Sequence, residues 1–223
     1  RIFAKKKSKE LDELGVLSMD NENLFGSVFY SYSLGQAISD GNLCDYQVMV
    51  VGVEDIATLQ SIENRDLVRA AGVSLDTASL ATHVALQKAI IGEGISKAIS
   101  FHSRISKARS FVSAHAELLP WMEKKLGRTR PFEGHVVSSE EPTALRRKKL
   151  SSLASASGDQ THLLANARCL TEGIDVPSLD AVIFVDPRSS QVDIIQAVGR
   201  AIRKGGESKT KGHIILPFAI AND

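Results

Sequence analysis

Six short apolar segments recur along the chain, and each has the length of a strand that is buried on both faces. They are rich in Val and Ile and show no strict alternation with polar residues, which is typical of strands in a central parallel sheet. The segments are Tyr46–Val53, Ala98–Phe101, His135–Ser138, His162–Ala165, Ala181–Val185 and His213–Phe218.

Helical patterns fill most of the intervals between these segments. We predict helices over Asp76–Ile91, Ser106–Leu119, Pro142–Leu153 and Val192–Arg203. Pro120 is expected to end the second helix, and Ser190 with Asp193 predicts a capping box at the start of the last. The alternation of strand and helix predicts a three-layer αβα domain of the α/β class, with helices on both faces of a mostly parallel sheet.

The pattern is weaker before Tyr46. Residues Leu11–Gly41 mix acidic, glycine and aromatic positions, which predicts a hairpin or an extended arm followed by a short helix. We therefore divide the chain into an arm over residues 1–45 and an α/β domain over residues 46–223.

The composition of the 223 residues, with 43% hydrophobic and 24% charged, is that of a globular protein. No segment approaches the ~18 consecutive apolar residues of a membrane span. The two cysteines, Cys44 and Cys169, lie far apart without the spacing of a zinc site or a disulfide framework. We expect a soluble, cytoplasmic protein with no membrane partner and no metal ligands in this chain.

The formal net charge of +1 is an average over two unlike regions. Between Glu10 and Asp76 the chain carries 12 acidic residues against Arg65 and Arg69, so the remainder has a net charge of +11. A basic surface for nucleic acid is therefore compatible with a protein that is almost neutral overall.

In an open parallel sheet, ligands bind outside the carboxyl ends of the strands. The residues that follow the apolar segments are small, polar or cationic, as a surface that faces phosphate would be. Among them are His102, Ser103 and Arg104, then Ser138, and later the segment Asp186–Ser189.

Two further segments carry candidate chemistry. In Asn166–Pro177, Gly173 lets the backbone approach a ligand, and Asp175 can accept a hydrogen bond from a ribose hydroxyl, although an ordinary loop fits equally. In Gln196–Arg203, the side chains of Gln196, Arg200 and Arg203 share a helix face, and two guanidinium groups suit phosphoryl oxygens. A solvated basic helix end is the alternative for this second segment.

Together, in this order and about twenty residues apart, the two segments resemble motifs V and VI of superfamily 2 helicases. The stretch from Leu170 to Arg203 is similar to the restriction-enzyme-like branch of DEAD/DEAH-type helicases. Ala98–Ser103 is similar to motif IV, Arg146-Arg147 to the arginine of motif IVa, and residues 18–46 to the connector that follows motif III. The resemblance implies that the chain is the second RecA-like domain of a two-domain motor, preceded by a connector in residues 1–45.

The resemblance also implies roles for individual residues. Arg200 and Arg203 would be arginine fingers, while Gly173, Asp175 and Gln196 would contact the nucleotide or couple its cleft to the motor. Nucleic-acid phosphates would be bound by His102, Ser103, Arg104, Ser138, Asn166, Arg168 and Thr171. The other histidines are interpreted as structural or exposed. Trp121 is interpreted as a core residue, and stacking of Trp121 and Phe132 on a base is the alternative.

The nucleotide-binding half of such a motor is absent from the sequence. No GxxxxGK[ST] motif is present, and Asp12-Glu13 follows no apolar strand as a Walker B acid should. We expect ATP and Mg²⁺ to be bound mainly by an N-terminal RecA-like domain of the same polypeptide, and the chain alone to hydrolyse no ATP.

The motifs favour DNA over RNA as the partner. Motif VI opens with Gln196-Ala197 where RNA helicases have His-Arg, and Thr171-Glu172-Gly173 replaces the Ala-Arg-Gly of DEAD-box proteins. We therefore predict a motor domain of an ATP-dependent DNA helicase or translocase related to restriction-modification or repair. The alternatives are an RNA helicase domain and a RecA-like module that binds nucleic acid without motor function.

Overall fold

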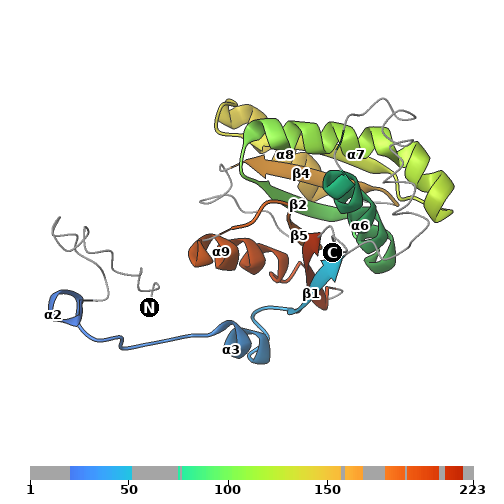
Figure 1. The fold of residues 1–223 in the computed structure, drawn as a ribbon. Helices are drawn as coiled ribbons and strands as arrows, with labels where there is room; N and C mark the ends of the chain where they lie inside the picture. Colours follow the sequence, from blue (N-terminus) through green and yellow to red (C-terminus); the bar gives the residue numbers. More distant parts are fainter. Residues whose placement is uncertain are drawn as a thin grey trace.

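The domain is built on one six-stranded sheet in which every pair of neighbouring strands is parallel (Figure 1). The computed structural model describes residues 21–51, 75, 77–156, 159–167, 179–188, 190–205 and 209–217. The spatial order of the strands is β1-β6-β5-β2-β4-β3. Their bounds are β1 Asp45–Val51, β2 Lys97–His102, β3 Phe132–Ser138, β4 Thr161–Ala167, β5 Ala181–Phe184 and β6 Lys211–Pro217. Each predicted apolar segment is therefore confirmed as a strand over the residues that the structure describes.

Helices cover both faces of the sheet, as predicted. On one face, α6 (Thr77–Glu93) and α7 (Ile105–Leu126) pack through Leu86, Ile90 and Phe111 onto inward-facing strand residues such as Ile183. On the other face, α8 (Thr143–Ser155) and α9 (Gln191–Ala201) contribute Leu150, Leu153 and Val198 to a second cluster. Because the strands contribute apolar side chains to both faces, the fold is the expected three-layer αβα arrangement.

Helix α7 is longer than its sequence signal. We predicted an end at Pro120, but the helix continues through this proline to Leu126, and Gly127 then adopts a positive φ of 73°. Proline removes one backbone donor from a helix interior. Met122 is nevertheless fully buried beside Leu118 and the residues of α6, so the apolar contacts of the last turn outweigh the lost hydrogen bond.

Helix α9 is shorter than predicted. The Ser190 hydroxyl accepts the backbone N–H of Asp193 at 3.3 Å, which is one half of the expected capping box. The helix ends at Ala201 and not at Arg203, because the chain turns at Ile202 and Arg203 forms an antiparallel bridge with Leu43. Arg203 therefore lies just beyond the helix that carries Gln196 and Arg200.

The described part of the arm is mostly extended. It contains the short helices α2 (Glu22–Phe25) and α3 (Leu34–Ser39), and a capping box of Ser33 and Gln36 begins α3. Figure 1 shows the segment around α2 lying well away from the sheet. The extended arm and short helix match one of the two predicted arrangements, while the boundary between residues 45 and 46 remains a prediction.

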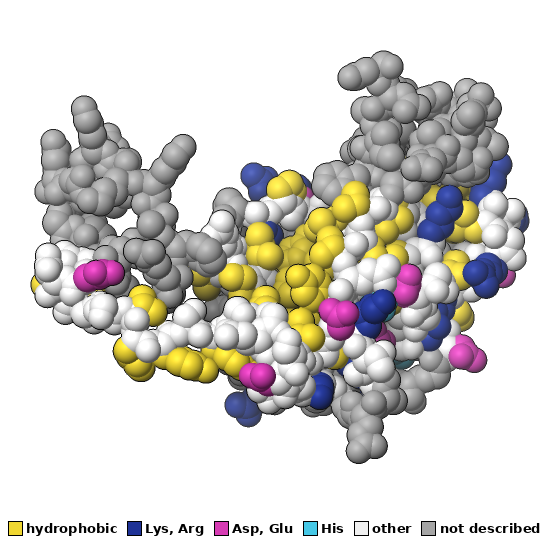
Figure 2. Space-filling model, turned by 90° about the horizontal axis from the view of Figure 1, so that it is seen from below, with side chains coloured by type: hydrophobic (Ala, Val, Ile, Leu, Met, Phe, Trp, Pro, Cys, Tyr) yellow, Lys and Arg dark blue, Asp and Glu magenta, His cyan; other side chains and the backbone are white. Residues whose placement is uncertain are grey.

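One face of the edge strand β1 is exposed. Tyr46, Val48 and Val50 are exposed, whereas Met49 and Val51 pack against the cluster under α6. Val48 lines an apolar hollow of about 370 Å³ together with residues of β5, β6 and α9. Figure 2 shows this hollow as a continuous hydrophobic patch, with further hydrophobic side chains along the arm.

Within the described part of the chain, none of the helices combines the length and the apolar character that crossing a bilayer requires.

Candidate nucleotide and nucleic-acid site

Three of the predicted phosphate contacts lie side by side where neighbouring strands end. Phe101 is paired with Asn166, and Asn166 in turn with Val137, so the register brings His102, Asn166 and Ser138 to the same edge. Their side chains are almost wholly covered, with exposures of 1%, 0% and 1%. The structure therefore gathers these residues as a buried polar row beneath the carboxyl edge of the sheet.

His102 is held by its neighbours. Its Nε2 lies 2.9 Å from the Ser100 hydroxyl, and its ring is tilted against Phe111 at a centroid distance of 4.9 Å. Burial lowers the pKa of His102 to about 4; the charge of Asp186 opposes this shift, and Arg188 adds to it. The imidazole is consequently neutral at physiological pH and can offer a hydrogen bond but no positive charge.

Ser103 and Arg104 form the turn that begins α7. Arg104 is the N-cap residue, its side chain makes no capping hydrogen bond, and it is exposed. The first N–H groups of a helix and the helix dipole favour an anion at this position. Among the described candidates at this edge, Arg104 is the exposed cation next to that helix end.

The loop after β5 holds this turn in place, and no feature of the sequence near Ser103 indicates that contact. The carboxylate of Asp186 accepts the Ser103 N–H at 2.7 Å and the Lys107 ammonium at 2.7 Å. Burial by itself raises the pKa of Asp186, but these two hydrogen bonds outweigh it, and the net pKa lies below the ordinary value. Arg188 donates to the His102 carbonyl at 3.3 Å and lies over the Phe101 ring.

The remaining candidates of motif V fall outside the described residues. β4 ends at Ala167, and the description resumes at Leu179. Arg168, Thr171, Gly173 and Asp175 lie between these points, so their predicted roles stay predictions.

The two predicted arginine fingers lie at the other edge of the sheet. Helix α9 starts after the carboxyl end of β5 and runs back, so its last turn contacts the segments that lead into β1 and β6. There the Cys44 N–H donates to the Ile202 carbonyl at 2.9 Å. Arg203 is exposed, Arg200 is partly buried, and Gln196 is exposed further back on the helix. The carboxyl-edge rule alone would have misplaced these side chains.

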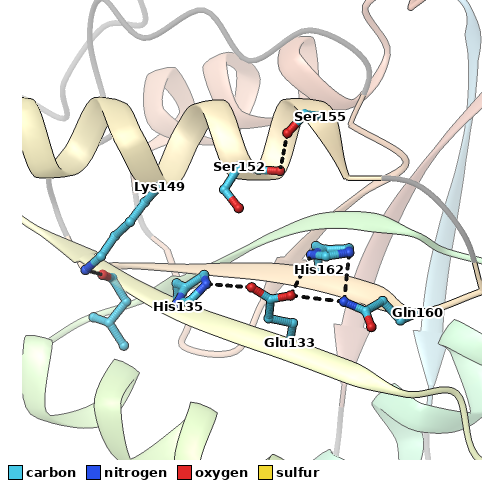
Figure 3. A network of polar contacts seen from close by, with 8 residues as sticks. Glu133, His135, Lys149, Ser152, Ser155, Gln160 and His162 are labelled. Atoms are coloured by element: carbon cyan, nitrogen blue, oxygen red, sulfur yellow. Dashed lines mark hydrogen bonds and ion pairs between the residues drawn. The ribbon is translucent and has the colours of Figure 1, made fainter.

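Four of the other five histidines form two groups that the sequence does not reveal, and His213 lies 3.8 Å from the Glu93 carboxylate. His83 and His115 are buried between α6 and α7, with their Nδ1 atoms 3.1 Å apart, and burial lowers the pKa of both. On the outer strands, Figure 3 shows Glu133 between His135 and His162, at 2.9 Å and 3.4 Å. No group of three His, Cys, Asp or Glu in the described part of the chain is arranged to hold a metal ion.

The all-parallel sheet in this strand order, with helices on both faces, is that of a RecA-like domain. A family model described as "Helicase conserved C-terminal domain" matches residues 83–205. The chain belongs to this family of helicase C-terminal domains.

Individual relatives agree with this assignment. The chain is 27% identical over 206 residues to "Probable helicase A859L" of an African swine fever virus tick isolate from Pretoriuskop, covering 92% of this chain and 21% of the viral protein. The same protein of the Badajoz strain is 28% identical with the same coverage. The chain therefore spans about a fifth of the length of these curated relatives.

One solved structure matches both in sequence and in shape. It is the "ATP-dependent Type ISP restriction-modification enzyme LlaBIII bound to DNA", with a TM-score of 0.78 and 30% identity. The match covers 92% of this chain and 14% of that protein. The restriction-enzyme-like character expected from the sequence thus has a structural counterpart.

Proposed function

We propose that this domain is the second motor domain of an ATP-dependent DNA helicase or translocase. The observation that carries the proposal is the likeness, over 92% of the chain, to an ATP-dependent restriction-modification enzyme that was solved on DNA. A relation to restriction-modification or repair is part of the proposal, and the same likeness supports the restriction-modification alternative.

The arginines at the end of α9 are proposed to act on ATP that is bound between this domain and an N-terminal RecA-like domain. A guanidinium is planar and permanently charged, so it can stabilise the charge that develops on the γ-phosphate oxygens. Arg200 and Arg203 lie at one edge of the sheet, where closure of the two domains can bring them to the phosphate. Gln196, Gly173 and Asp175 are proposed to contact the nucleotide or to couple its cleft to the motor.

ATP and Mg²⁺ are proposed to be held mainly by the N-terminal domain, because this sequence contains no phosphate-binding GxxxxGK[ST] motif. We expect the chain alone to be inactive as an ATPase. The exposed hydrophobic side chains of the arm and of β1 support a further domain of the same polypeptide as a partner.

Nucleic acid is proposed to cross the carboxyl edge. Arg104 supplies positive charge at the N-terminus of α7, and the loop from Asp186 to Arg188 supports the turn of Ser103. Phosphate contacts of this kind position a strand without reading its sequence. His102, Ser138 and Asn166 lie directly beneath and shape this surface, and Arg168 and Thr171 are proposed to extend it.

The test compares the purified full-length protein with the isolated residues 1–223. We expect ATP hydrolysis by the full-length protein to rise with duplex DNA more than with RNA, and the isolated domain to show none. Binding of both nucleic acids is titrated at two ionic strengths, because phosphate contacts weaken steeply with salt. Stimulation by RNA alone would favour an RNA helicase, and binding without hydrolysis by the full-length protein would favour a module without motor function.

A further inference from the structure

The end of helix α9 is fixed by contacts from outside the helix. The last carbonyl groups of an α-helix have no partner within the helix and need one elsewhere. The Ile202 carbonyl accepts the backbone N–H of Cys44 at 2.9 Å. The carbonyls of Ala201 and Arg203 accept hydrogen bonds from a side chain, the ammonium group of Lys209.

Lys209 joins three carbonyl groups from two segments. Its Nζ lies 2.5 Å from the Leu179 carbonyl and 2.9 Å from the Arg203 carbonyl, and it also contacts the Ala201 carbonyl. An ammonium group has three donors and no acceptor capacity. All three donors are therefore used on backbone oxygens, and the charge lies at the negative end of the helix dipole.

The packing around this contact leaves little room for movement. Gly212 on β6 has no side chain, and a Cβ at that position would overlap the Ala201 carbonyl. The backbone of β6 therefore touches the end of α9 directly. Lys209, two residues before β6, holds the same helix end through hydrogen bonds. Leu179 follows the Gly173 and Asp175 positions of motif V, four residues after Asp175 in the sequence.

We propose that Lys209 is a positioning residue for ATP hydrolysis, which holds the turn of Arg203 in register with the Leu179 segment. The inference rests on the proposed function, because Arg203 is the group that Lys209 positions. Lys209 does not touch the phosphate in this role. It fixes the backbone from which the Arg203 guanidinium extends, and a displacement of about 1 Å in such a group can cost about 10²-fold in rate.

Partial burial of Lys209 disfavours its charged form. It lowers the pKa of Lys209, while Cys44 and Asp180 oppose the shift. The charged form, which makes all three hydrogen bonds, is consequently lost at a lower pH than in an exposed lysine. Arginine at this position keeps its charge throughout this range.

The experiment uses steady-state ATP hydrolysis by the full-length protein in saturating DNA. Lys209→Met keeps most of the side-chain volume and removes the donors. We expect kcat to fall at least about tenfold, while the KM for ATP changes less than about threefold, because the positioned arginine acts in the transition state. Lys211→Met is the matched control, since Lys211 is exposed at the first position of β6, two residues after Lys209, and its Nζ lies near Gln47 on β1.

Two further variants separate positioning from simple support of the fold. Lys209→Arg should recover part of kcat and move the alkaline limb of the pH profile to higher pH. In an Arg203→Ala background, Lys209→Met should lower kcat little further, since the group that it positions is gone. An equal loss in both backgrounds, or a Lys209→Met enzyme within about twofold of the wild type, overturns the proposal.

The outcome also distinguishes this inference from the proposed function. An unchanged kcat in Arg203→Ala alone would remove the finger role itself, whatever Lys209 does. A large loss in Arg203→Ala with no loss in Lys209→Met would keep the proposed function and reject the positioning role. If Lys209→Met does not fold, Lys209→Arg is compared in the wild-type protein and in Arg203→Ala. A loss of kcat in the wild-type background alone supports the proposal, and an equal loss of kcat in both backgrounds rejects it.

Discussion

The two edges of the sheet carry different kinds of polar residue. At the carboxyl edge, His102, Asn166 and Ser138 are buried, and the histidine is neutral. At the amino edge, Arg203 is exposed and its turn is fixed by Lys209 and by the neighbouring strands. The buried row shapes a surface whose charge comes from Arg104 and its neighbours, whereas the amino edge presents its own charge directly.

Helix direction accounts for this division. Helix α7 begins at the carboxyl edge and presents N–H groups there, which favour an anion. Helix α9 ends at the amino edge and presents carbonyl groups, which favour cations such as Arg200 and Lys209. The same fold therefore places helix N–H groups at one edge, where nucleic-acid phosphates are proposed to bind, and holds arginines at the other.

Of the two edges, the amino edge should have the larger effect on ATP hydrolysis. Arg203→Ala in the full-length protein should lower kcat for ATP hydrolysis by about 10³-fold, because an arginine finger stabilises charge that develops only in the transition state. The affinity for ATP should change far less. Steady-state kinetics and equilibrium nucleotide binding measure the two quantities.

Arg128→Ala provides the control, since Arg128 is an exposed arginine in the segment that leads into β3, the outer strand at the end of the sheet opposite β1 and β6. A kcat of Arg203→Ala equal to that of this control would remove the functional difference between the two edges.

Acid should destabilise the carboxyl edge through His102, and the lowered pKa of His213 near the amino end of β6 acts in the same direction. The pKa of His102 is about 4 in the folded protein and about 6.5 when exposed. The unfolded state therefore binds more protons between these values, so stability is full above pH 6.5 and falls as the pH drops toward 4. Urea unfolding at pH 7.5 and 5.0 should differ by about 2 kcal/mol for this residue.

The buried pair of His83 and His115 adds to the same acid loss, because burial also lowers the pKa of both. A His102→Gln variant should therefore show a smaller pH dependence that is not abolished. His135→Gln, which changes a partly exposed histidine on β3, serves as the comparison. Identical pH dependence in His102→Gln and the wild type would show that His102 is not buried as a neutral group.

The strands were predictable because a strand that is buried on both faces of a parallel sheet needs a continuous run of apolar residues, and such runs are visible in the sequence. The failures arose where long-range contacts overrode a local signal. Burial of Met122 carried α7 past Pro120, and pairing with Leu43 ended α9 before Arg203.

The candidate site shows the same limit. The sequence identified the turn of Ser103 but not its support by Asp186, because that contact joins residues 83 positions apart. The position of His102 after an apolar run suggested a phosphate contact, yet Phe111 and Ser100 cover its ring. Burial of this kind depends on packing between elements, which spacing along the chain does not encode.

The smallest predicted effect concerns which cations of the carboxyl edge meet nucleic acid. Arg104 is exposed at the start of α7, whereas the ammonium of Lys107 is held 2.7 Å from the Asp186 carboxylate. A cation that neutralises a phosphate contributes about one unit to the salt dependence of binding. Arg104→Ala should therefore reduce the slope of log K against log salt by about 1 and weaken DNA binding a few-fold.

Lys107→Met should change the slope less than Arg104→Ala, because its charge already faces a carboxylate within the protein. Fluorescence anisotropy with the full-length protein at several salt concentrations measures both slopes. An equal change in the two variants would mean that Asp186 releases Lys107 when DNA binds. The carboxyl edge would then present its own charge as the amino edge does, and the division between the edges would hold only for the free protein.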